Sequence, residues 1–159
     1  MRPGRAAAWL LMVAAGCQAA PAPATRVRVN LGGSERGQYE GTAATSACVR
    51  APAGPGSLGV QFTDWTGPKD GLRSLSLVVP ATTRPGDFYL GMVFGDFFAG
   101  HVLEIETRAG APAARGHGAV RVAPGGGTTT VTVTGTTDEA VTLTATITCV
   151  NPAAEGAGR

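Results

Sequence analysis

The sequence predicts an all-β protein, an antiparallel β-sandwich of about nine strands with no substantial helix after the N-terminal segment. From Arg26 onward, short alternating apolar and polar segments are separated by clusters of Gly, Pro and Asp, which is the pattern of half-buried strands joined by turns. Apolar residues make up 43% of the chain, and most are Val, Ala or Leu scattered among Thr and Gly. No segment of useful length has helical periodicity, so a sheet protein is expected.

Each expected strand is an alternating segment bounded by turn-forming residues. In chain order they span residues 26–31, 38–48, 57–65, 72–79, 88–95, 101–108, 118–123, 128–135 and 140–150. Most have ordinary strand lengths, and together they fit an immunoglobulin-like or similar sandwich.

The last two strands carry the clearest signal. In residues 141–149 the odd positions are apolar and the even positions are Thr, so one face should meet the core and the other solvent. Between the expected strands 118–123 and 128–135, the segment Pro124 to Gly127 predicts a hairpin turn that pairs Val120 and Val122 with Val131 and Val133.

The N-terminus predicts export. Arg2 and Arg5 form a basic n-region, residues 6–15 form a short apolar region, and small residues follow, which is the architecture of a secretory signal over residues 1–16. Ten apolar residues are too few to span a bilayer as a helix. Without Arg2 and Arg5, acidic and basic residues are equal in number, and such a neutral domain lacks the basic surface that nucleic-acid binding needs.

The segment Ala14-Ala15-Gly16-Cys17 resembles the lipobox of bacterial lipoproteins. The resemblance implies that Cys17 is diacylated and becomes the new N-terminus, anchoring the protein in a membrane. Gln18 resembles the outer-membrane sorting signal, should the envelope have two membranes. Ordinary cleavage after Ala24 is the alternative, because Ala22-Pro23-Ala24 also fits a cleavage site.

The segment after Cys17 predicts a short tether over residues 17–25. Its sequence QAAPAPAT favours an extended polyproline path, and eight residues at about 3.1 Å each would reach roughly 25 Å. The β-sandwich domain is then expected over residues 26–151, followed by a flexible tail over 152–159.

The three cysteines fall into two groups: Cys17 lies in the N-terminal segment, and Cys48 and Cys149 lie in the expected domain. If Cys17 is lipidated or removed, Cys48 and Cys149 remain as an even pair. Cys149 shares the apolar parity of its strand, so its sulfur should point inward, where a disulfide with Cys48 would bridge the two layers. The alternative is two buried free thiols.

The sequence predicts no enzyme, metal site or cofactor. It contains no G-x-S-x-G string for a serine hydrolase. On a strand, His101 and Glu104 lie on opposite faces and cannot converge on one ion, and His117 is expected in a solvated loop. Asp64, Asp70, Asp87 and Asp96 fall at strand ends, where carboxylates commonly hold turns together.

The most unusual local feature is the pair Phe97 and Phe98 between glycines. Two adjacent rings on a regular strand cannot both point into the core, so one is expected either to plug the end of the sandwich or to form an exposed contact patch. Trp65, at another strand end, has the same two interpretations.

The overall layout resembles the mycobacterial lipoprotein antigen family and other small secreted β-domain proteins of bacterial envelopes. The matching parts are Val27-Arg28-Val29, residues 41–48 ending in Cys48, and the terminal residues 144–149 ending in Cys149. The resemblance implies an envelope lipoprotein and supplies no catalytic residues. We therefore expect a non-enzymatic structural or interaction module with an envelope protein or glycan as partner. The alternatives are a small-ligand or glycan-binding domain using Phe97, Phe98 and Trp65, and, less favoured, a hydrolase.

Overall fold

The computed structural model describes residues 24–49, 57–81, 86–96 and 98–150. This part of the chain is all-β and contains no helix, so the predicted fold class is confirmed. The expected signal segment, Cys17, most of the tether, Phe97 and the C-terminal tail lie outside the described residues.

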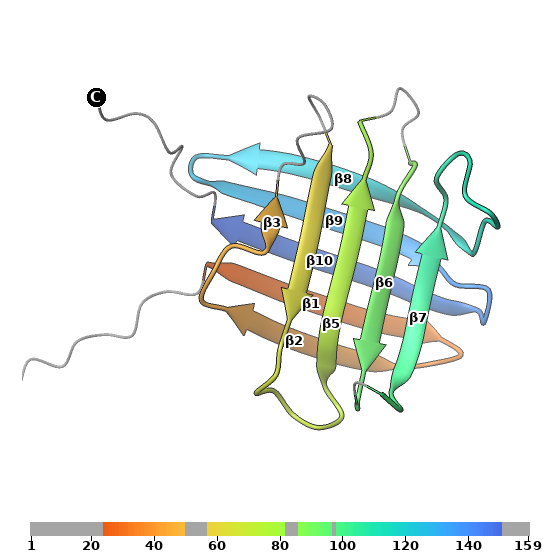
Figure 1. The fold of residues 1–159 in the computed structure, drawn as a ribbon. Helices are drawn as coiled ribbons and strands as arrows, with labels where there is room; N and C mark the ends of the chain where they lie inside the picture. The colour runs from red at the N-terminus through yellow and green to blue at the C-terminus, as the bar shows by residue number, and fades with distance from the viewer. Residues whose placement is uncertain (1–23, 50–56, 82–85, 97, 151–159) are drawn as a thin grey trace, which may run out of the picture.

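Two antiparallel sheets of five strands form the two layers (Figure 1). The first sheet has the order β2-β1-β10-β9-β8, with strands Gly37–Ala43, Thr25–Gly33, Val141–Val150, Thr128–Thr136 and His117–Gly125. The second sheet has the order β3-β4-β5-β6-β7, with strands Cys48–Val49, Leu58–Thr63, Leu72–Val79, Tyr89–Phe94 and His101–Glu106. In the view of Figure 1 the strands of one sheet run across those of the other.

The strand count differs from the expectation at one place. Residues 38–48 were expected to form a single strand, but β2 ends at Ala43 and β3 begins at Cys48 in the opposite sheet. The buried hydroxyl of Thr25 holds the segment that passes from one sheet to the other, since it donates to the carbonyl of Thr45 and accepts from the backbone N–H of Ala47. The described chain therefore has ten strands.

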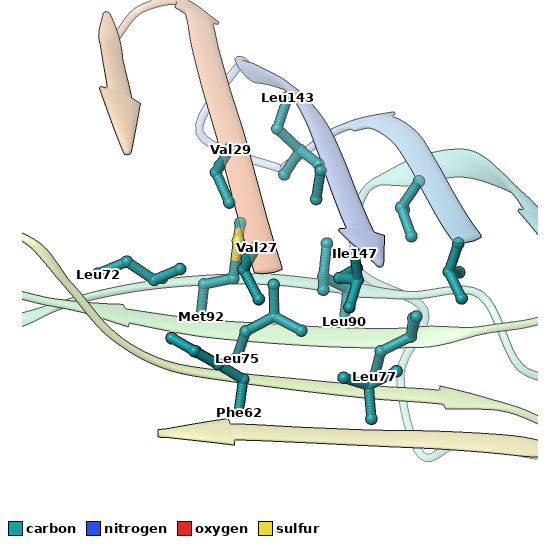
Figure 2. Close-up of a cluster of buried hydrophobic side chains, with 14 of the residues drawn as sticks. Val27, Val29, Phe62, Leu72, Leu75, Leu77, Leu90, Met92, Leu143 and Ile147 are labelled. Atoms are coloured by element: carbon teal, nitrogen blue, oxygen red, sulfur yellow. The ribbon is translucent and has the colours of Figure 1, made fainter. Parts of the chain in front are cut away.

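The core lies between the sheets and draws on both (Figure 2). Val27, Val29 and Ile147 of the first sheet face Leu75 and Leu90 of the second, and all five are at most 1% exposed. Strand β10 alternates as predicted, with its odd positions buried and its threonines on the outer face. The predicted hairpin is also confirmed, because β8 and β9 pair Val120 with Val133 and Val122 with Val131.

A disulfide joins the layers. Cys48 on β3 and Cys149 on β10 are bonded, with Cα atoms 5.9 Å apart and a sequence separation of 101 residues. Cys149 is fully buried, as its strand parity predicts. The alternative of two free thiols is therefore wrong.

Candidate functional site

The two described aromatic candidates, Trp65 and Phe98, lie at the same end of the second sheet. Trp65 is on the loop between β4 and β5, and Phe98 is on the loop between β6 and β7; both loops are at the lower end of the sheet in Figure 1. Trp65 is 73% exposed and Phe98 is 101% exposed, so neither ring plugs the sandwich. We call residues 64–71 together with 95, 96 and 98–100 the aromatic loop end.

The loop that carries Trp65 is held by Asp64. One carboxylate oxygen of Asp64 accepts hydrogen bonds from the backbone N–H groups of Thr66, at 2.9 Å, and Gly67, at 2.8 Å. This is an Asx-type turn, in which a short acidic side chain satisfies donors two and three residues ahead. Asp64 therefore has the turn role that its position in the sequence predicts.

The loop that carries Phe98 is built in the same way. Gly95 has a φ of +81°, a left-handed conformation that glycine adopts without steric cost. Asp96 then accepts hydrogen bonds from the backbone N–H groups of Phe98, at 2.8 Å, and Ala99, at 3.2 Å. The two rings are thus carried on loops of fixed local geometry.

Arg73 joins the two loops. Strand β5 pairs Leu72 with Phe94 and Ser74 with Val93, so Arg73 is the extra residue of a β-bulge, a device that re-aims a side chain. The Arg73 guanidinium donates to the carbonyl of Gly95, at 2.7 Å, and to that of Gly67, at 3.0 Å. Only 9% of Arg73 is exposed. Nothing in the sequence pattern singled out this arginine.

A second cluster of polar side chains lies on the outer face of β6 and β7. The Tyr89 hydroxyl donates to Glu104, which also pairs with Arg115 at 2.6 Å. Arg108 lies over the Tyr89 ring, 5.3 Å from its centroid, and its Nε donates to Glu106 at 2.8 Å.

The electrostatics of this cluster are those of a structural ion-pair network. The hydrogen bond from Arg108 lowers the pKa of Glu106, and the same bond raises the pKa of Arg108. Burial, followed by the Glu104 charge, raises the pKa of Tyr89 above its ordinary value. A general base or nucleophile at neutral pH needs shifts toward neutrality, and these three shifts run away from it.

The outer face of the first sheet carries a shallow depression of about 380 Å³. Its lining side chains are polar and come from β1, β2 and β10: Arg26, Arg28, Glu40, Thr42, Thr146 and Thr148. Arg28 pairs with Glu40 at 2.8 Å. Arg26 lies opposite Thr42 on one side and Thr148 on the other, and among the described residues it forms no ion pair.

Neither histidine belongs to the polar cluster on β6 and β7. His101 contacts Glu35 of the β1–β2 turn at 2.9 Å, and strand parity places it on the opposite face from Glu104. His117 was expected in a loop, but it is the first residue of β8, where it pairs with Thr136. Within the described ranges, no three His, Cys, Asp or Glu side chains gather closely enough to bind a metal ion.

Comparisons with known proteins add no functional information, so a proposal about function rests on the fold and on the surfaces described above. No protein family, curated protein or solved structure matches the chain significantly. Over the described residues, no helix is long and apolar enough to cross a membrane.

Proposed function

We propose that the chain is an exported, lipid-anchored β-sandwich of the bacterial cell envelope, a non-enzymatic interaction module that contacts its partner through the aromatic loop end. The observation that carries the contact site is the exposure of Trp65 and Phe98 on two loops that Arg73 joins. Large apolar rings exposed on a small domain typically mark interaction sites.

Two observations support export. The basic and apolar segments before Cys17 have the order of a secretory signal. A disulfide closes most of the domain, and structural disulfides persist in oxidising compartments outside the cytosol. The lipobox resemblance adds the anchor, with Cys17 as the acylated N-terminus and residues 17–25 as the tether.

Intact mass spectrometry of the protein from its native host tests the anchor. A diacylglyceryl adduct on a chain that begins at Cys17 is the expected result, together with a deficit of about two daltons from the disulfide. An unmodified chain that begins at Thr25 would show ordinary cleavage and overturn the lipid anchor.

Sedimentation with isolated cell envelopes tests the contact site. The chain from residue 18 onward should sediment with envelopes, and the double variant Trp65→Ser/Phe98→Ser should stay in the supernatant with an unchanged Tm, since both rings are exposed. Val122→Ser is a matched control, because Val122 is 40% exposed on β8 of the other sheet. Equal sedimentation of all three proteins would contradict the proposal.

A second candidate function, small-ligand or glycan binding, is favoured by the depression around Arg26. An arginine between threonine hydroxyls presents a cation beside hydrogen-bonding groups, which suits a carboxylated sugar or another small anion. Titration with acidic and neutral oligosaccharides, followed by NMR shifts, would test it. Saturable shifts in the acidic series that Arg26→Gln abolishes would support this site, and no saturable shift would exclude it.

A further inference from the structure

The geometry points to one partner for the aromatic loop end: the interfacial layer of a lipid bilayer, into which Trp65 and Phe98 insert. The inference rests on the proposed function, because the lipid anchor is what keeps a membrane within reach. Three features of the loops favour a bilayer over a glycan or a protein pocket.

The first feature is how the rings are exposed. A ring that stacks on a sugar is usually supported on one face and open on the other. Phe98 is 101% exposed and Trp65 is 73% exposed, so the Phe98 ring is open on both faces and around its edge. A ring that is open on all sides gains most when an apolar medium surrounds it.

The second feature is the hydrogen bonding of the loops. Inserted backbone must satisfy its polar groups within the protein, because acyl chains offer no partners. Asp64 and Asp96 accept from the N–H groups of residues 66, 67, 98 and 99. Arg73 satisfies the carbonyls of Gly67 and Gly95, and the Gly95 N–H donates to the Gly71 carbonyl at 2.9 Å.

The third feature is the position of the tether. Its last residue, Thr25, pairs with Ala43 on β2, whereas Val29 pairs with Tyr39. The Tyr39 ring packs on Phe94, at the start of the Phe98 loop, with centroids 4.6 Å apart. Tyr39, which contacts Phe94, is therefore offset from the start of β1 by four residues of strand, roughly 13 Å, and this offset is shorter than the tether's reach of roughly 25 Å.

Charge predicts how this contact depends on lipid type. The loops contain Asp64, Asp70 and Asp96 against Lys69 and the adjoining Arg73, so the end has no excess of positive charge to attract anionic headgroups. We expect insertion to be driven by apolar burial, to proceed in phosphatidylcholine alone, and to change little with salt.

The fluorescence of Trp65 provides the test. The chain has two tryptophans, Trp9 and Trp65, and cleavage before Cys17 removes Trp9. The mature lipidated protein is reconstituted in phosphatidylcholine vesicles. Trp65 emission should shift to the blue relative to the protein in solution, and lipids brominated along the acyl chain should quench it.

Variants separate insertion from mere tethering. Phe98→Ser should lower the vesicle partition coefficient of the chain from residue 18 onward about tenfold, corresponding to the loss of one buried ring. Its Tm should not change, because Phe98 is fully exposed. Val122→Ser should leave both the partition coefficient and the Trp65 quenching as they are in the unaltered protein.

Two results would overturn the inference. An emission maximum of Trp65 that does not change on vesicle binding, together with no quenching by brominated lipids, would exclude insertion. If envelope sedimentation still depended on Trp65 and Phe98, the interaction module would stand with a partner other than lipid. If sedimentation were independent of both rings as well, the proposed function of this surface would also fail.

Discussion

The Nε atom of Arg73 lies 2.7 Å from the carbonyl oxygen of Gly95, and this hydrogen bond ties the β5 bulge to the loop that carries Phe98. Replacing Arg73 with Met should cost about 1–3 kcal/mol of unfolding free energy, because the part-buried carbonyls of Gly67 and Gly95 lose their donor. Urea denaturation of the chain from residue 18 onward measures this cost. The anisotropy of Trp65 should fall as the loops loosen.

Arg73→Lys is the matched control for that change. A lysine keeps the charge but cannot bond two divergent carbonyls with a planar fork, so its stability should lie between those of the unaltered protein and Arg73→Met. If both variants melted like the unaltered protein, Arg73 would not hold the loops.

The disulfide should supply a large share of the stability of the domain. Cys48 and Cys149 close a loop with a sequence separation of 101 residues, and removing such a bond typically costs about 2–5 kcal/mol. The double variant Cys48→Ser/Cys149→Ser should therefore have a much lower urea midpoint. Reductant should destabilise the unaltered protein to the same extent and leave the variant unaffected, and an unaltered protein indifferent to reductant would contradict this assignment.

The ion pair of Glu106 and Arg108 should make stability fall in acid. The pKa of Glu106 is lowered in the folded protein by its hydrogen bond from Arg108. The contribution of this carboxylate to the free energy of unfolding is therefore fully present above the unfolded pKa of about 4.3. It is lost as the pH falls through the lowered folded pKa. Glu106→Gln should reduce unfolding free energy at pH 7 and flatten its decline between pH 5 and pH 2. Parallel acid profiles for the two proteins would show that the pair contributes nothing.

Gly41 should tolerate no larger side chain. A Cβ at this position would lie 2.5 Å from the tip of the Phe62 ring, and Phe62 is fully buried. Gly41→Val should cost about 1–3 kcal/mol through overpacking. Thr42→Val, one residue along on the exposed face, should have little effect in the same thermal melt. Equal melting temperatures for the two variants would show that the core accommodates the larger side chain at Gly41.

The strands with strict alternation were the most predictable from sequence. The period of two in β10 fixes which face is buried, so the inward direction of Cys149 followed from parity alone. The break between β2 and β3 was not predictable in this way. Residues 44–47 contain no Gly or Pro, and the hydroxyl of Thr25, about 20 residues earlier in the chain, determines where the strand leaves its sheet.

The aromatic residues of the candidate site could be noticed in the sequence, but the arginine that holds their loops could not. An aromatic pair between glycines is unusual enough to be noticed, and Trp65 at a strand end shares that quality. Whether such a ring plugs the core or faces solvent depends on packing against distant strands, which local pattern does not encode. Arg73 was missed because a bulge shifts register by one residue without requiring a particular residue type there.

The position of the disulfide also determines how the domain would bear tension. Ala24 and Val150 lie together at one corner, where the Val150 N–H donates to the Ala24 carbonyl. A pull between these two residues runs along β1 and β2 to Cys48, then through the sulfur atoms to Cys149. Only the segment between Ala24 and Cys48 can then be extended by the force, because the chain from Cys48 to Cys149 is bypassed by the covalent bond between the two sulfur atoms and carries none of the tension.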